Sequence, residues 1–329
     1  METAPSHDSD LRRPLTIGIA GGPGVSTVIY MLRSILDGDD PYAHAGVVCS
    51  LETFDGVERR VGWRGTPAER DLARYTAHAR TAGLDYLVVE VPCGEQSPCA
   101  LDAAAFDLFC SLDSGSCVGR SGHVTTFSVG NTGADVWSDS ERCSLGVVSF
   151  AAHTPSWQWR VAFPMPGAFN VRNALAAIAI CMELGIDPAR IVERFFYVRV
   201  PGRMELLLTP DRDIVGIIDQ AVDAVSCREF FSAVAEEFPG YRFEAVLGNA
   251  DVDDDDLPWG ITLFAPSPTR EDAILTAVEC AYECYDYVLV CLLGSGGAPD
   301  RAQLDADIFN EAVRRFSPGP WTLSNEEQL

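Results

Sequence analysis

The chain of 329 residues is long for a single domain and carries 48 acidic against 24 basic residues, a formal net charge of −24. All basic residues are arginines, because the sequence contains no lysine. This charge disfavours nucleic acid and anionic lipid as partners, and the absence of lysine excludes Schiff-base chemistry. The sequence predicts neither a membrane span nor a secretory signal. We expect a cytoplasmic two-domain protein with a short flexible tail at residues 1–14.

The first half of the chain alternates between apolar runs and helical patterns. A strand over Leu15–Ala20 leads into the glycine-rich segment GGPGVST and a helix over about 27–36. A second helix is predicted at about 67–82, followed by strands over Asp85–Val91 and Phe106–Leu112. This alternation is typical of a parallel sheet that helices cover on both faces.

The middle of the chain changes character. Short β-rich segments between about 123 and 165 predict antiparallel strands at one edge of the parallel sheet. A helix is predicted over Phe169–Gly185, with Asn170 or Asn173 near its start, and Asp187 followed by proline is typical of the start of another helix.

A second α/β series follows the junction VPGRMELL at Val200–Leu207. Strands are predicted at about 213–219, 241–248, 260–265 and 285–294, and helices at about 224–238, 269–283 and 301–316. The pattern indicates a smaller Rossmann-like domain. We therefore expect domains at 15–200 and 201–329.

The segment GGPGVST contains most of a phosphate-binding loop. Gly21 and Gly24 suit the turn, and Ser26 and Thr27 are potential magnesium ligands, but Val25 stands where such a loop has its lysine. Two interpretations follow: a weakened nucleotide site, or a strand-to-helix turn kept for the fold. We favour the second.

Four stretches, in this order along the chain, resemble the Mur ligase family and most closely its UDP-N-acetylmuramoyl-tripeptide synthetases: IGIAGGPGVSTVIYMLRSIL, TPAERDLARYTAHARTAGLDYLVVEV, PGAFNVRNALAAIAICMELGI and VPGRMELL. The resemblance implies a central ATPase-like domain with a P-loop-type parallel sheet and a C-terminal Rossmann-like domain. The family's N-terminal uridine-binding domain is expected to be absent, since the first predicted strand begins at Leu15.

The resemblance also implies a nucleotide site formed by Gly21, Gly24, Ser26, Thr27, Asn173, Arg203 and Asp219, with Ser26 and Glu90 as metal ligands. No catalytic residue is assigned. The family's loop lysine is Val25 here, the histidine of its D-Y-A-H segment is Val222, and no lysine is available for carbamoylation. One transition-state donor is commonly worth about 3–4 kcal/mol. We therefore expect negligible ligase activity and no resident cofactor; ATP and magnesium are the cofactors if the nucleotide site survives.

Two functions remain open. The first is a catalytically inactive or strongly impaired Mur-ligase-like protein, a peptidoglycan-related pseudoenzyme that binds or regulates a second copy, an intact Mur ligase or another cell-wall enzyme. The alternative is a divergent ATP-dependent carboxylate–amine ligase for UDP-N-acetylmuramoyl peptides, in which Arg172, Arg203 or Arg270 replaces the missing cations.

The eleven cysteines are an odd number without a secretory signal, which predicts reduced and buried thiols. The cluster from Cys93 to Cys117 lacks the paired spacing of zinc sites, so a metal or redox role is the weaker interpretation.

Overall fold

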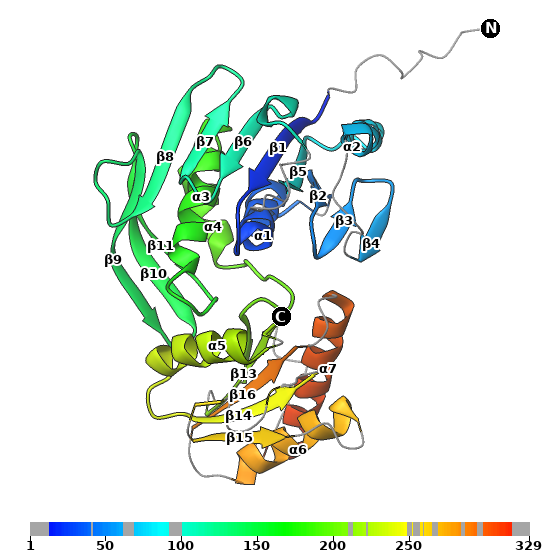
Figure 1. The fold of residues 1–329 in the computed structure, drawn as a ribbon, viewed down its shortest axis with the longest axis vertical. Helices are drawn as coiled ribbons and strands as arrows, with labels where there is room; N and C mark the ends of the chain where they lie inside the picture. Colours follow the sequence, from blue (N-terminus) through cyan, green and yellow to red (C-terminus); the bar gives the residue numbers. More distant parts are fainter. Residues whose placement is uncertain are drawn as a thin grey trace, which may run out of the picture. The chain divides into compact units, whose positions relative to one another are not determined.

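A computed structural model describes residues 13–40, 42–61, 69–91, 101–209, 213–221, 223–248, 252, 257–258, 260–264, 269–283, 287–294 and 299–317. The chain divides into two compact units, Met1–Val200 and Pro201–Leu329, each with its own sheet and core (Figure 1). Among the helices formed by these described residues, none is both long enough and apolar enough to cross a lipid bilayer.

The larger unit is built on an eleven-stranded sheet in the order β11-β10-β9-β8-β7-β6-β1-β5-β2-β3-β4. Its four central strands are parallel: β6 (Leu108–Ser111), β1 (Leu15–Ala20), β5 (Tyr86–Val91) and β2 (Ala45–Val48). Antiparallel strands extend both sides, with β3 (Glu52–Phe54) and β4 (Arg59–Val61) on one side and, on the other, β7 (Ser116–Gly119), β8 (Val124–Val129), β9 (Val136–Ser144), β10 (Val147–His153) and β11 (Gln158–Phe163).

This sheet confirms the predicted parallel core with antiparallel additions and corrects two details. The prediction had antiparallel strands at one edge only, whereas the hairpin of β3 and β4 extends the other edge as well. These strands are three residues long, too short for an alternating pattern to identify. Within the β7–β11 extension, β8 and β9 pair in parallel.

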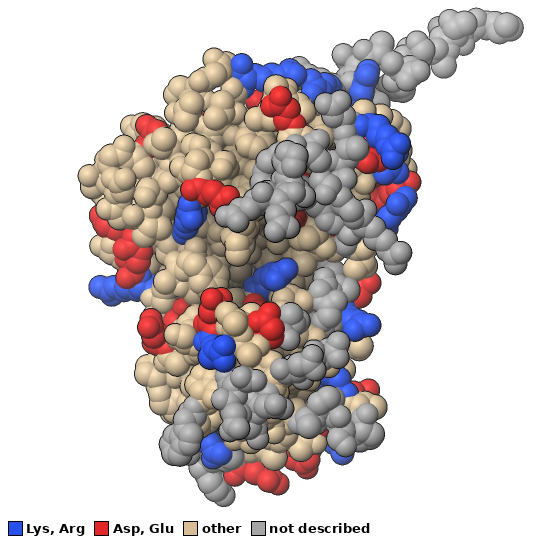
Figure 2. All heavy atoms as spheres, in the orientation of Figure 1, with Lys and Arg blue, Asp and Glu red and all other residues tan. Residues whose placement is uncertain are grey.

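Helices cover both faces of the central strands. On one face α1 (Val25–Asp37) packs on β1, β2 and β5, while α3 (Asn170–Glu183) and α4 (Pro188–Phe195) pack on the β6–β11 part of the sheet, and all three helices belong to one apolar cluster. On the other face α2 (Glu69–Thr81) packs on β5, and the short 3₁₀ helix η1 (Ala103–Ala105) lies before β6. Figure 2 shows arginine side chains over the region that α2 occupies in Figure 1.

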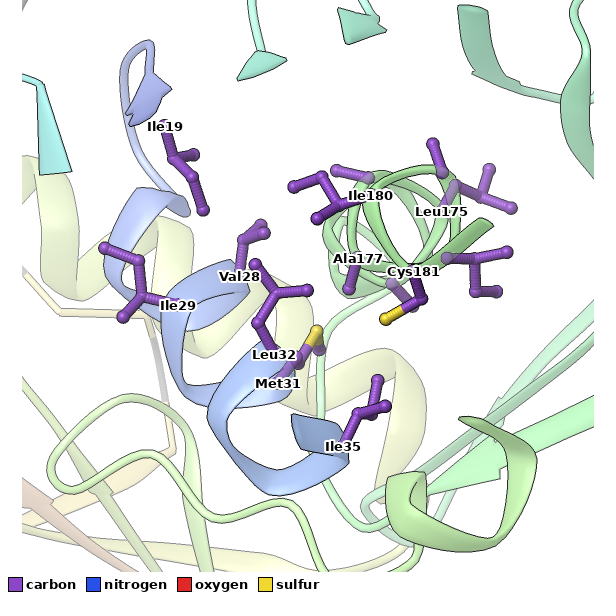
Figure 3. Close-up of a cluster of buried hydrophobic side chains, with 14 of the residues drawn as sticks. Ile19, Val28, Ile29, Met31, Leu32, Ile35, Leu175, Ala177, Ile180 and Cys181 are labelled. Carbon is purple, nitrogen blue, oxygen red and sulfur yellow. The ribbon is translucent and has the colours of Figure 1, made fainter. Parts of the chain in front are cut away.

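The contact between α1 and α3 forms the centre of the larger core (Figure 3). Val28 and Leu32 of α1 and Ala177 and Ile180 of α3 are fully buried there, together with Ile19 of β1. Because the start of α1 is fixed by this packing, so is the glycine loop that precedes it.

The start of α3 agrees with the prediction that Asn170 lies near it. Phe169 occupies the N-cap position without a side-chain hydrogen bond, and Asn170 lies in the first turn, where its Nδ2 donates to Pro166 O at 2.6 Å. Asp187 does cap α4, as predicted, because its carboxylate accepts the Ala189 N–H at 2.8 Å.

The smaller unit contains a five-stranded sheet with helices on both faces. The strand order is β12 (Glu205–Leu208), β13 (Ile214–Asp219), β16 (Val288–Leu293), β14 (Arg242–Leu247) and β15 (Ile261–Phe264), and only β12 is antiparallel to its neighbour. One face packs on α5 (Ala224–Glu237), the other on α6 (Arg270–Glu283) and α7 (Pro299–Phe316). This is the predicted Rossmann-like arrangement, although the second half of the junction segment forms β12.

Candidate functional site

The glycine loop connects β1 to α1 at the carboxyl end of the parallel strands. Gly21 and Gly24 have φ of +136° and +107°, a backbone region that side chains with a Cβ rarely adopt. The N-cap Gly24 offers no side-chain acceptor to the first N–H groups of α1. Ser26 is half-buried and Thr27 is buried in the first turn. A helix start of this kind has backbone donors for an anion.

Val25, the first residue of α1, belongs to the core rather than to the loop surface. Its side chain is 4% exposed and lies in the apolar cluster that joins α1, α3 and the sheet. The position that carries a cation in a phosphate-binding loop therefore contributes packing here.

A carboxylate lies against the loop. Gly22 N–H donates to Asp113 Oδ1 at 3.3 Å, and Asp113 is exposed just after β6. A negative group thus engages one of the donors that a phosphate would use. Asp113 was not among the predicted site residues. The signal for it is an acidic residue just after the strand beside β1, because the carboxyl ends of parallel strands share one edge.

Arg172 adds one cation to the same place. From the first turn of α3, its Nη2 donates to Leu112 O and, at 3.3 Å, to Asp113 O. The side chain is exposed. Arg172 therefore holds the segment that carries Asp113 and remains accessible to solvent.

The Asn173 side chain of α3 packs closely against Gly24 of the loop. A Cβ added to Gly24 would lie 2.4 Å from Asn173 Oδ1, so this glycine permits close approach of the amide. Asn173 Nδ2 in turn donates to Asn170 Oδ1 at 2.9 Å, and both asparagines are at most 6% exposed. The structure thus brings together two residues of the predicted nucleotide site, Gly24 and Asn173.

Glu90 lies near the end of β5, beside Ile19 of β1 in the register. Its Oε2 accepts the Ser50 N–H at 2.7 Å, which fixes the carboxylate at the carboxyl edge of the sheet. In the part of the chain that the structure describes, no group of three or more histidine, cysteine, aspartate or glutamate side chains is arranged to hold a metal ion. The pairing of Ser26 with Glu90 as metal ligands stays a prediction.

In the smaller unit, Asp219 at the end of β13 binds the backbone of the segment before β12 and of the residues that follow β13. Its Oδ2 accepts the Met204 N–H at 2.8 Å and its Oδ1 the Ala221 N–H at 3.1 Å. Burial raises the pKa of Asp219, while these hydrogen bonds and the charge of Arg203 oppose the rise. Arg203 Nε is buried and has no hydrogen-bond partner among the described residues. Both oxygens of Asp219 thus have structural partners.

Arg270 is held by a buried carboxylate. Its Nε and Nη2 donate to Asp305 at 3.0 and 2.8 Å, and the Asp305 side chain is 4% exposed. This bidentate pair connects α6 to α7. Most of the guanidinium is therefore engaged within the fold, whereas Val222, which stands for the family's histidine, lies outside the described residues.

The described cysteines are free thiols, and most are buried: Cys49, Cys110, Cys117, Cys181, Cys227 and Cys291. Burial raises the pKa of Cys49 to about 12 and that of Cys227 to about 11. Thiols of this kind are poor nucleophiles and poor metal ligands. Cys93 and Cys99, which belong to the cluster considered for a metal, lie outside the described residues.

Comparison with known proteins finds no matching family model but several similar sequences. The chain is 34% identical over 127 residues to the UDP-N-acetylmuramoyl-L-alanyl-D-glutamate–2,6-diaminopimelate ligase of Synechocystis, which covers 38% of this chain and 25% of that protein. It is 25% identical over 281 residues to the enzyme of the same name from Caldanaerobacter subterraneus, covering 74% of this chain and 58% of that protein. The chain thus spans less than two thirds of either relative.

Solved structures share the fold at low sequence identity. A UDP-N-acetylmuramoyl-L-alanyl-D-glutamate–2,6-diaminopimelate ligase matches with a TM-score of 0.59 at 14% identity, covering 90% of this chain and 79% of that chain. The folylpolyglutamate synthase of Thermotoga maritima matches with a TM-score of 0.60 at 16% identity, covering 91% and 89%. The protein therefore resembles the Mur ligases in sequence and has the fold that they share with folylpolyglutamate synthase.

Proposed function

We propose that this protein is a Mur-ligase-like scaffold without ligase activity that acts as a binding or regulatory subunit in peptidoglycan synthesis. The glycine loop carries the proposal. Val25 is buried where the lysine is needed, and Asp113 engages a loop N–H that a phosphate would use. The loop thus retains its shape while its electrostatics oppose a triphosphate.

The energetics support this reading. Ligation through an acyl phosphate concentrates negative charge in the transition state, and preorganised cations and donors lower its free energy. Here the loop lysine is missing, no lysine exists elsewhere, and the hydrogen bonds of Arg172 go to the backbone oxygens of Leu112 and Asp113. The loss of one such group commonly lowers the rate by about 10²–10³. Several simultaneous losses leave the expected rate negligible.

The test combines nucleotide binding with turnover. Thermal unfolding is followed with and without 5 mM ATP and magnesium, and phosphate release is measured with UDP-N-acetylmuramoyl-L-alanyl-D-glutamate and 2,6-diaminopimelate. An intact diaminopimelate ligase serves as the positive control. Ligand at 100 times its Kd stabilises a protein by about 2.7 kcal/mol, which is readily seen. We expect neither a shift nor turnover; magnesium-dependent ATP turnover would refute the proposal.

The subunit role is tested by association. The purified chain is mixed with an intact Mur ligase from the same organism and analysed by sedimentation velocity, alone and in the mixture. We expect a complex with the ligase or a dimer of the chain itself. A chain that sediments as a monomer in both samples and leaves the ligase rate unchanged would contradict a regulatory role in this pairing.

The second candidate is an ATP-dependent carboxylate–amine ligase, and the position of Arg172 favours it. This exposed arginine contacts the segment of Asp113, whose carboxylate accepts the Gly22 N–H, and it has N–H groups beyond those that contact Leu112 and Asp113. In that case Gly21, Gly24, Ser26 and Thr27 would hold the phosphates, and Glu90 would help to hold magnesium. Turnover that the Arg172→Ala variant loses, with unchanged thermal stability, would support this candidate.

A further inference from the structure

Two buried cysteines face each other across neighbouring strands of the large sheet. β7 lies between β6 and β8 (Figure 1), and its register places Cys117 directly opposite Cys110 of β6. Both side chains are 0% exposed and belong to the apolar cluster that includes α3. Residues directly opposite each other in an antiparallel pair point to the same face of the sheet. The two thiols therefore lie side by side in the core of the larger unit.

Backbone hydrogen bonds identify the kind of pair that the two cysteines form. The Leu112 N–H donates to β1, so the backbone groups of Cys110, two residues earlier, also face β1. The carbonyl oxygen of Gly115, two residues before Cys117, accepts a hydrogen bond from β8, so the backbone groups of Cys117 face β8. Neither cysteine directs its backbone groups at the other. They form a non-hydrogen-bonded pair, in which the Cα atoms are about 4.5 Å apart.

This separation is compatible with a disulfide, whose Cα atoms are usually about 4.4–6.8 Å apart. The thiols of Cys110 and Cys117 already share a side-chain hydrogen bond. Burial and this hydrogen bond raise the pKa of the Cys117 thiol well above its ordinary value. Cys117 is therefore protonated while the strands stay paired, and its oxidation requires local opening of the hairpin.

The hairpin of β6 and β7 carries a group of the candidate site. Its turn connects Ser111 to Ser116, and Asp113 within that turn accepts the Gly22 N–H of the glycine loop. A covalent link between the two strands, one residue beyond this last pair, closes a short ring around the turn. Such a ring reduces the number of conformations that the turn can adopt when the strands separate.

We propose that Cys110 and Cys117 form a reversible disulfide that restrains the turn carrying Asp113, with a low-molecular-weight disulfide such as oxidised glutathione as the oxidant. One cysteine thiolate attacks a sulfur of the oxidant and releases the first glutathione thiolate, which takes up the proton that the cysteine lost. The second cysteine thiolate attacks the mixed disulfide at the protein sulfur and releases the second glutathione. Two protein thiols are oxidised, and one glutathione disulfide is reduced to two thiols.

The test measures the linked fraction of the folded full chain in glutathione buffers, approached from both the reduced and the oxidised side. Acid-quenched chains are alkylated under denaturing conditions and cleaved before aspartate and after arginine, which separates residues 107–112 from 113–120, each with one of the two cysteines. We expect an effective concentration of the thiol pair at least about 10-fold higher in the folded protein than in guanidinium chloride. Equal values in the two states overturn the proposal.

Two variants assign the link to this pair. Cys117→Ala removes one partner and is expected to abolish the linked peptides. Cys181→Ala removes another fully buried thiol of the same apolar cluster, on α3, and is expected to change the linked fraction less than about 2-fold. A link between Cys181 and either strand cysteine in the parent chain refutes the assignment.

Hydrogen exchange followed by mass spectrometry measures the effect on the turn. We expect the amides of residues 108–119 to exchange at least about 5-fold more slowly in the linked protein, and to regain the original rate after reduction with a phosphine. Helix α7 of the smaller unit is the internal control and should exchange equally in both forms. Unchanged exchange of 108–119 in a fully linked sample refutes the restraint. Disulfide formation and ATP turnover are measured independently, so the result does not depend on the proposed loss of ligase activity.

Discussion

At the scale of single residues, Asp113 is the group that we expect to control anion binding at the glycine loop. Its carboxylate accepts the Gly22 N–H, so replacement by a neutral amide removes a repulsive charge while keeping the shape. We predict that Asp113→Asn binds inorganic pyrophosphate about 3–10-fold more tightly than the parent at low salt, measured by isothermal titration calorimetry. Asp300→Asn, an exposed change on α7, is the control. Equal affinities for parent and Asp113→Asn would contradict the prediction.

A second residue, Glu244 of β14, predicts a pH dependence of stability. Its side chain is 2% exposed, its Oε2 has no hydrogen-bond partner among the described residues, and burial raises its pKa from 4.5 to about 7. The folded state then holds a proton that the unfolded state has lost between these pH values. The contribution of Glu244 to stability is therefore full below about pH 4.5 and is lost as the pH rises through 7.

The neutral variant Glu244→Gln removes this dependence. At pH 8 we expect the free energy of unfolding of the variant to exceed that of the parent by up to roughly 2–3 kcal/mol. At pH 4.5 this difference should vanish. Urea unfolding followed by circular dichroism at both pH values measures the effect. Glu229→Gln, at an exposed site on α5, is the control and should show no such difference. A gain that is equal at both pH values would show that Glu244 does not titrate in this range.

At the scale of elements, the junction between the glycine loop and α3 depends on a missing Cβ. Gly24→Ala places a methyl 2.4 Å from Asn173 Oδ1 and strains a φ of +107°. We predict a loss of about 3 kcal/mol or more, measured by urea unfolding. Gly83→Ala, at a φ of +74° with no heavy atom within 4 Å, isolates the backbone cost and should lose about 1 kcal/mol.

The double variant Gly24→Ala with Asn173→Ala separates the two causes. Removing the amide relieves the clash but not the backbone strain, so the double variant should be more stable than the sum of the single losses by about 1 kcal/mol. Strict additivity would show that Asn173 does not press on the loop.

At the scale of the whole molecule, burial predicts which thiols react. Among the described cysteines, Cys143 and Cys280 are half-exposed and the others are buried. We predict that iodoacetamide at pH 8 labels Cys143 and Cys280 first, while Cys49 and Cys227 react only on unfolding, because burial raises their pKa to about 12 and about 11. Peptide mapping by mass spectrometry assigns each site. Early labelling of Cys49 in the folded protein would contradict the prediction.

The fold was largely predictable from the sequence because its long elements have clear patterns. The apolar strands β1, β5 and β16 and the periodic helix α3 were placed within a few residues. The short hairpin of β3 and β4 and the parallel β8–β9 pair were missed, since register and direction depend on contacts distant in the sequence. The prediction that Asn170 lies near the start of α3 is confirmed, whereas the donation of its Nδ2 to Pro166 O was not predicted.

The candidate site was predictable only in part. The glycines and Val25 are visible in one short segment, but Asp113 contacts the loop from 91 residues away, and Arg172 contacts Asp113 from 59 residues away. The engagement of Arg270 by Asp305 likewise depends on helix packing that no local motif reports.

The large sheet ends, within the described residues, in two open strands, β11 and β4. An uncovered strand is a template on which further chains can add and grow into aggregates. Arg160 stands exposed on β11, and Arg59 and Arg60 on β4. A second strand that paired with either edge would have to accommodate these guanidiniums, so their charge opposes edge-to-edge growth.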